Sequence, residues 1–158
     1  MPISKSTRHS KIVGDFGEHL VCNWLSRSGF EVSRVDHTGI DVLAYNKELD
    51  CRLGISVKSR TRHLGTEGDS VFVFRQAADR ASLLAACEAF ACVPWLAVYV
   101  ESESEGNLFL TGLNNYDQKY RAGKATESWR MTPGQVRKYS ADPDVKHIHI
   151  AFNSRNWW

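Results

Sequence analysis

Apolar residues recur at steps of three and four positions between Ile12 and Ser28, which is the spacing of one face of an α-helix. Ser28 and Gly29 follow this stretch, and a glycine in the left-handed conformation commonly ends a helix. We therefore predict a first helix over residues 12–28, with Glu18 near its first turns. Its apolar stripe consists of Val13, Phe16, Leu20, Val21, Trp24 and Leu25.

Three apolar segments follow the helix and have the lengths and patterns of β-strands, at residues 30–35, 40–45 and 51–59. Polar turn-forming residues at 36–39 and 46–50 separate them. Strands that follow one another through short turns pair in opposite directions. The pattern therefore predicts an antiparallel meander.

The next strongly patterned region is an alanine- and leucine-rich helix over residues 76–90, which Pro94 ends. Residues 95–100 are almost wholly apolar, as expected for a buried central strand, and residues 107–113 form another strand. Because a helix connects the strand at 51–59 to the one at 95–100, these two strands can run parallel. We predict an α/β domain with an α-β-β-β-α-β core, in which helices flank a mixed central sheet.

The remaining segments have weaker patterns. Residues 71–74 are a short apolar run, predicted as a strand or as the entry into the helix. The last part of the chain is predicted to be irregular, with one helix near 132–139 and a final edge strand near 146–152. The expected division is a basic arm at residues 1–10, an α/β core at 11–113 and a C-terminal extension at 114–158 packed on the core.

Composition places the chain among soluble globular domains, with 158 residues, 42% hydrophobic and 24% charged. The net charge of +2 does not by itself indicate a nucleic-acid binder. The four cysteines show no CxxC pair or zinc spacing, which is typical of free thiols in a reducing compartment. No secretion signal, membrane-length apolar run or glycine-rich phosphate loop is found. We expect a cytoplasmic protein with no membrane association and no organic cofactor.

Candidate chemistry lies in the second and third predicted strands. A hairpin centred near Glu48 sets Asp41 opposite Ile55 or Ser56, and side chains alternate along a strand, so Asp41 can share a face with Ser56 and Lys58. Gly39 lets the chain turn sharply and leaves Asp41 at the start of its strand. The hairpin therefore predicts a carboxylate and an amine at one place.

A carboxylate and an amine suit metal-dependent cleavage of a phosphodiester, which needs a hard cation and a group that stabilises developing charge. Asp41 would anchor Mg²⁺ or Mn²⁺, the Val57 carbonyl would be a second ligand, and Glu18 would reach the same ion from the first helix. Lys58 would orient the attacking water or neutralise charge. The plainer alternative is that Asp41 caps a turn and Lys58 is an ordinary solvent-facing residue.

The order of these motifs resembles the PD-(D/E)XK nuclease superfamily, in particular its branch of archaeal Holliday junction resolvases and small restriction-endonuclease-like proteins. The resemblance implies a restriction-endonuclease-like fold and a magnesium-dependent endonuclease that acts on DNA, in which Glu18, Asp41 and Lys58 share the site. The motifs that carry it are Gly14-Asp15-Phe16-Gly17-Glu18, Ser28-Gly29-Phe30-Glu31-Val32, Gly39-Ile40-Asp41 and Val57-Lys58.

Residues beyond the catalytic set are also implied. Gln76 resembles a polar residue that some members use near the substrate, and Arg60 and Arg62 lie just past the third strand, where they would hold DNA phosphates. Members of the superfamily are commonly dimers, so we expect a homodimer, and Trp157 and Trp158 would serve such an interface.

One position departs from the family pattern. Ser56 stands where the superfamily has an acidic residue two positions before the lysine. Either another acid compensates, namely Glu18 or, from loops, Asp36 or Glu67, or the site is weakened. The alternative function is a weakened or inactive nuclease-fold module that binds nucleic acid or a protein partner. A third reading is an interaction subunit with no nucleic-acid role.

Overall fold

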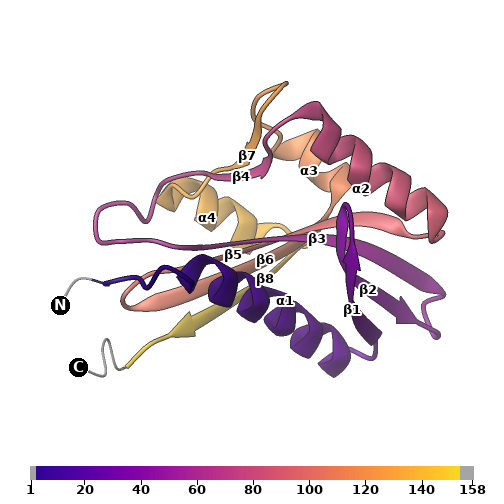
Figure 1. Cartoon of the computed structure of the whole chain (residues 1–158), viewed down its shortest axis with the longest axis horizontal. Helices are drawn as coiled ribbons and strands as arrows, with labels where there is room; N and C mark the ends of the chain where they lie inside the picture. Colours follow the sequence, from indigo (N-terminus) through magenta and orange to yellow (C-terminus); the bar gives the residue numbers. More distant parts are fainter. Residues whose placement is uncertain (1–2, 154–158) are drawn as a thin grey trace.

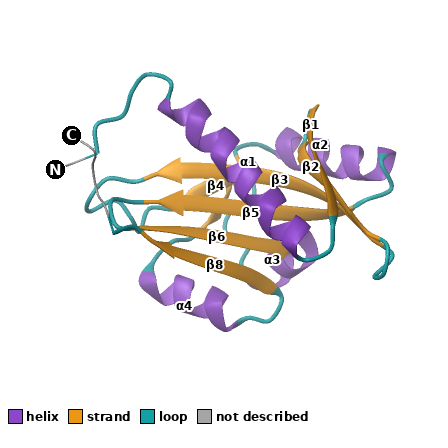
Figure 2. Cartoon of the chain, turned by 90° about the horizontal axis from the view of Figure 1, so that it is seen from below, coloured by secondary structure: helices purple, strands orange, loops and turns teal. Residues whose placement is uncertain are grey.

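The structure is a computed structural model that describes residues 3–153, and a six-stranded mixed sheet forms its centre (Figures 1 and 2). The strand order is β1-β2-β3-β5-β6-β8. All neighbours are antiparallel except β3 and β5, which run parallel as predicted. The strands are β1 (Glu31–His37), β2 (Ile40–Asn46), β3 (Cys51–Thr61), β5 (Val93–Glu101), β6 (Glu105–Gly112) and β8 (Val145–Ala151).

Helices cover both faces of this sheet. Helix α1 (His9–Arg27) lies across one face, as Figure 2 shows. A second small sheet of β4 (Val71–Phe74) and β7 (Glu127–Trp129) packs on the opposite face. The helices on that opposite face are α2 (Ala77–Ala89), α3 (Leu113–Lys119) and α4 (Pro133–Ala141).

Burial along β5 explains why the sheet is covered twice. Leu96 and Val98 pack into the core beneath α2, whereas Ala97 and Tyr99 pack into the core beneath α1. Successive side chains of a strand point to opposite faces, so a strand that is apolar throughout needs a layer on each side. The predicted α/β class and the flanking helices are therefore confirmed.

Helix α1 begins at His9, three residues before the predicted start, and ends at Arg27. Gly29 follows with φ of +86°, which confirms the predicted left-handed glycine. Within the helix, a Cβ on Gly17 would collide with Ser59 Oγ. The absence of a side chain at Gly17 thus lets α1 approach β3 closely, next to Glu18.

The segment after residue 113 contributes α3, β7, α4 and β8. The predicted helix and the predicted last strand are present as α4 and β8, and β8 is an edge strand of the central sheet, paired with β6. The sequence pattern did not reveal α3, because only Leu113 and Tyr116 of its seven residues are buried. Trp157 and Trp158 lie outside the described residues.

Two further predictions concern the cysteines and membrane-spanning segments. Cys22, Cys51, Cys87 and Cys92 are free thiols, as expected, and burial raises the pKa of Cys87 to about 11. Over residues 3–153, no helix has both the length and the apolar character required to cross a bilayer.

Candidate functional site

The turn between β1 and β2 determines where Asp41 lies. Gly39 has φ of +94°, a backbone conformation that favours glycine, and a Cβ at this position would collide with the backbone carbonyl of Ser82 in α2. The turn is therefore packed directly on α2. Strand β2 begins at Ile40, which places Asp41 at its second position, half-buried.

The Asp41 carboxylate lies against β3. The antiparallel ladder of β2 and β3 runs from Asn46 paired with Cys51 to Val42 paired with Ile55. Just past its end, Oδ2 of Asp41 accepts a hydrogen bond of 2.7 Å from the backbone N–H of Val57, which lies 16 residues away along the chain. Asp41 thus bonds to a neighbouring strand rather than to its own turn, and its carboxylate lies beside the position that precedes Lys58.

Asp41 and Glu18 line the same pocket, of about 490 Å³. Its walls come from α1, from β1 and from Asp41 of β2. The lining residues are Lys11, Asp15, Glu18, Arg34, Val35, Asp36, His37 and Asp41. Four of these side chains are carboxylates and two are lysine or arginine, so the pocket is acidic and favours a cation.

Glu18 is already paired with Arg34 of β1. Nε and Nη2 of Arg34 donate to Glu18 Oε2 at 2.8 and 2.6 Å, and Nη2 also reaches Asp15 Oδ1 at 3.2 Å. The bond to Glu18 raises the pKa of Arg34, and the bond from Lys11 lowers the pKa of Asp15. Neither Asp15 nor Arg34 is among the site residues predicted from the sequence.

A sequence signal existed for one of these two residues. Asp15 precedes Glu18 by three positions, so both lie on one face of α1. No comparable signal marked Arg34, because its contact with Glu18 depends on how β1 packs beside α1.

Ser56 and Lys58 line a different, smaller pocket of about 130 Å³, toward α2 and β4. Ser56 is only 5% exposed, and Lys58 is half-buried. None of the ion pairs within residues 3–153 involves Lys58. The last two residues of β1, at 36–37, line the first pocket, and the turn residues at 38–39 line the second. The structure therefore sets the predicted acids and the predicted amine in two neighbouring compartments that share no lining residue.

The carboxylate oxygens of the Asp41 pocket are the atoms that could bind a hard cation. Over the described residues, no group of three or more His, Cys, Asp or Glu side chains is arranged to hold a metal ion. The hydrogen bonds to Asp41 and Glu18 described above use one oxygen of each carboxylate, Oδ2 of Asp41 and Oε2 of Glu18. The other oxygen of each carboxylate is left for a ligand. Mg²⁺ is commonly held by one or two carboxylates and keeps several waters, so these two side chains fit it in kind.

The other acids proposed to compensate for Ser56 lie in different places. Asp36 lines the same pocket as Asp41. Glu67 lies in the loop after β3, where its Oε2 accepts the backbone N–H of Gly65 at 2.7 Å, and it lines a pocket that Asp41 does not reach.

The predicted DNA-binding residues lie near the end of β3 and the start of α2. Arg60 is half-buried and donates to the carbonyl of Ser59 at 2.7 Å. Arg62 donates to the carbonyl of Ser70 at 2.8 Å and so closes the loop after β3. Gln76 is exposed at the N-cap of α2, where the Asp79 carboxylate accepts its backbone N–H at 3.2 Å.

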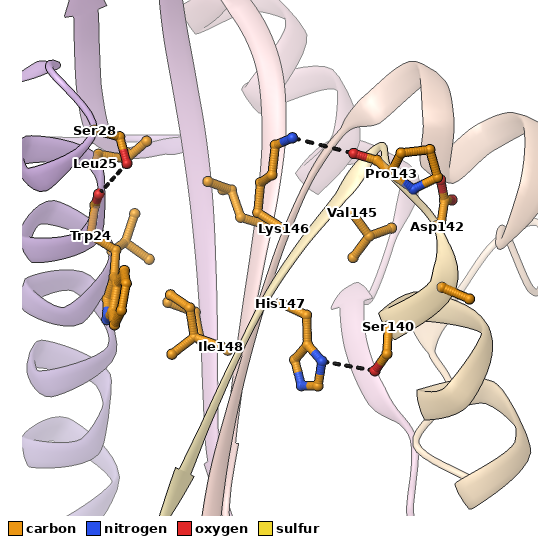
Figure 3. A pocket seen from close by; sticks show the side chains of 14 residues that line it. Trp24, Leu25, Ser28, Ser140, Asp142, Pro143, Val145, Lys146, His147 and Ile148 are labelled. Carbon is orange, nitrogen blue, oxygen red and sulfur yellow. Dashed lines mark hydrogen bonds between the residues drawn. The ribbon is translucent and has the colours of Figure 1, made fainter.

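A further pocket, of about 590 Å³, lies between α1 and the edge strand β8 (Figure 3). Trp24 and Leu25 of α1 face Ile148 of β8 across it, and the Ser140 hydroxyl and His147 Nδ1 form a hydrogen bond of 2.8 Å at its side. None of the predicted site residues lines this pocket.

Comparison with known proteins supports the fold. No family model matches the chain, and no curated protein sequence matches it. Among solved structures, the chain is similar to Hjc of Archaeoglobus fulgidus, a Holliday junction resolvase from an archaeal hyperthermophile, with a TM-score of 0.55, 17% sequence identity, and coverage of 74% of this chain and 83% of that one. At this identity the likeness establishes the fold alone: the central sheet and its flanking helices form the restriction-endonuclease-like fold that was predicted.

Proposed function

We propose that this chain is a metal-dependent endonuclease that hydrolyses phosphodiester bonds in DNA, with Asp41, Glu18 and Lys58 at its site. The observation that carries the proposal is the hydrogen bond from the Val57 N–H to the Asp41 carboxylate. It sets that carboxylate beside Val57, the residue that precedes Lys58. The Lys58 amine has no ion-pair partner among residues 3–153. A fold like that of a Holliday junction resolvase supports the same class of reaction.

The roles follow from the chemistry of each group. A bound Mg²⁺ or Mn²⁺ polarises a phosphoryl oxygen and lowers the pKa of a water molecule. Asp41 and Glu18 would hold the ion, with the Val57 carbonyl as a further oxygen donor. Lys58 would stabilise the charge that develops on the phosphate, which is most effective from a half-buried position where water screens it less.

The direct test is nicking of branched and linear DNA with Mg²⁺ and with Mn²⁺, comparing the wild type with Asp41→Asn. The asparagine keeps an oxygen that accepts the Val57 N–H, so the variant should retain the wild-type melting temperature. We expect metal-dependent cleavage by the wild type and none by the variant. Equal cleavage by both proteins would show that Asp41 is not part of the site.

A second candidate function is a nuclease-fold module that binds DNA without cleaving it. Two observations favour it: the neutral side chain of Ser56, and the pairing of Glu18 with Arg34 at 2.6 Å. DNA affinity measured across a salt series distinguishes the two functions. Salt-dependent binding by a protein that cleaves nothing with either metal would establish the second function.

The proposal also includes a homodimer, since members of the nuclease superfamily that the motifs resemble are commonly dimers. Sedimentation of the free protein tests this point, and a monomer at micromolar concentration would contradict it. Lack of DNA affinity even at low salt would instead favour an interaction subunit that has no nucleic-acid role.

A further inference from the structure

Within residues 3–153, no ion pair involves Arg60, Arg62 or Arg75, which we call the arginine cluster. Arg60 and Arg62 lie two positions apart at the end of β3. Burial lowers the pKa of Arg60, and the positive charges of Arg75 and Arg62 lower it further. The cluster is therefore an uncompensated positive charge.

A fourth arginine on the same side of the central sheet does have acidic partners. Arg80 of α2 makes hydrogen bonds of 2.5 and 3.0 Å to Asp117 and of 2.6 and 2.9 Å to Glu127, so two acids neutralise it. The acids nearest in sequence to the three arginines, Glu67 and Asp79, accept hydrogen bonds from backbone N–H groups instead. Asp79 accepts the N–H groups of Arg75 and Gln76 at the start of α2.

An exposed aromatic ring adjoins this cluster. In β4, Val71, Val73 and Phe74 are buried, but Phe72 is 44% exposed. The guanidinium carbon of Arg75 lies 5.6 Å from the centroid of the Phe72 ring. The neighbouring residues of the same strand, Val73 and Phe74, line the pocket of Lys58, so β4 borders that amine while the Phe72 ring faces outward from the strand.

Positive charge together with an exposed aromatic ring is the composition of surfaces that bind single-stranded nucleic acid. Arginines hold the phosphates, while rings and guanidinium planes stack on unpaired bases. A continuous duplex offers its phosphates to such a surface but keeps the faces of its bases stacked inside the helix. A phenylalanine exposed among arginines therefore favours a strand with unpaired bases.

We propose that Phe72 and Arg75 form a stacking platform for an unpaired base of DNA, and that Arg60 and Arg62 hold the adjoining phosphates. The placement of this platform at the cleavage site rests on the proposed function of Lys58. The protein would then prefer DNA with a single-stranded segment over a continuous duplex.

The test is equilibrium binding in EDTA, without metal, to a single-stranded oligonucleotide and to a duplex of the same sequence. Phe72→Ala should weaken binding to the single strand by about 5- to 150-fold, the range expected for one lost base stack, and should leave duplex binding almost unchanged. Phe72→Trp should restore the single-strand affinity. Arg60→Gln should reduce the salt dependence of single-strand binding by about 0.7 in log–log slope, as for one lost phosphate contact.

Matched controls come from elsewhere on the surface. Phe90 is 41% exposed and its ring contacts His37 rather than an arginine, so Phe90→Ala should not change single-strand affinity. Arg27 lies 4.2 Å from the ring centroid of Trp24 on α1, so Arg27→Gln controls for an arginine–aromatic pair outside the cluster. Equal losses on single strand and duplex, no loss in Phe72→Ala, or a loss of the same size in Phe90→Ala would each overturn the proposal.

Failure of the platform and failure of the proposed function can be told apart. Binding in EDTA does not depend on cleavage, so a wild type that cleaves no DNA still reports whether Phe72 selects a single strand. Conversely, cleavage that requires Asp41 but ignores Phe72 would remove the platform and leave the proposed function in place.

Discussion

The pocket of Asp41 and the pocket of Lys58 are lined by consecutive residues, 36–37 and 38–39, yet they differ in charge. The Asp41 pocket has four carboxylates and two basic side chains, Lys11 and Arg34. The Lys58 pocket has one amine and one carboxylate, Asp79, and Arg60 follows Lys58 two positions along β3, so this side is the more basic one. In the proposed function, the first compartment would hold a cation and the second would hold phosphates.

The two compartments also differ in how their charges are satisfied. In the acidic one, Arg34 neutralises Glu18 and reaches Asp15. In the basic one, the charges of Lys58, Arg60 and Arg75 are left without acids of the described chain. Charge that is not neutralised within the protein remains available to a ligand. In the proposed function, the basic side would therefore bind DNA directly, whereas on the acidic side Arg34 and the cation would compete for Glu18.

The largest effect is expected at the β1–β2 turn, where Gly39 lines the Lys58 pocket. Gly39→Ala forces a side chain into φ of +94° and against the Ser82 carbonyl, so the free energy of unfolding should fall by about 3 kcal/mol or more. Gly65→Ala is the matched control, because Gly65 has φ of +88° but open space around it, and should cost only about 1–2 kcal/mol. Urea unfolding measures both, and equal losses would mean that the packing on α2 is unimportant.

Removing the amine of the basic compartment should come next. Lys58→Gln is expected to slow single-turnover cleavage at saturating Mn²⁺ by about 10²- to 10³-fold, the cost of losing one group that stabilises transition-state charge. The Mn²⁺ concentration for half-maximal rate should stay within about twofold, because the acids are untouched. Lys47→Gln, in the exposed β2–β3 turn, controls for loss of a lysine. If Lys58→Gln changes the Mn²⁺ concentration for half-maximal rate and leaves the rate itself unchanged, the two compartments do not have separate roles.

Adding an acid at position 56 should join the two compartments. Ser56→Glu adds a carboxylate next to Lys58, and we expect the Mn²⁺ midpoint to fall by about tenfold, since each further carboxylate strengthens the binding of a hard cation. Ser56→Gln has nearly the same size without the charge and should leave the midpoint unchanged. An unchanged midpoint in Ser56→Glu would place the cation out of reach of residue 56.

The smallest effect is expected from freeing Glu18. Arg34→Gln removes a partly exposed ion pair, so stability should fall by less than about 1 kcal/mol. The Mn²⁺ midpoint should fall a few-fold, because Glu18 no longer has a competing partner. Lys11→Gln is the control, since Lys11 pairs with Asp15 but not with Glu18. If Arg34→Gln raises the midpoint, Arg34 orients Glu18 for the metal rather than competing with it.

Elements with long, clear periodicity were predictable from the sequence alone. The apolar stripe of α1, the strands that precede and follow the turn at 46–50, and the alanine-rich α2 all lie within a few residues of their expected places. The short elements were harder. Strand β7 has three residues and α3 has seven, too few for a repeating pattern, and their burial depends on partners distant in the chain.

The alternation of side chains and the glycine turn at Gly39 are local properties. The order of residues was therefore enough to predict that Asp41 lies next to β3, where it bonds to Val57, the residue before Lys58. The partners of those groups are a different matter. Arg34 of β1 meets Glu18 of α1, and Arg80 of α2 meets Glu127 of β7, only because separate helices and strands pack together in three dimensions. Charge compensation across such packed surfaces leaves no periodic mark along the chain, which is why folding, and not the order of residues alone, separates the acidic compartment from the basic one.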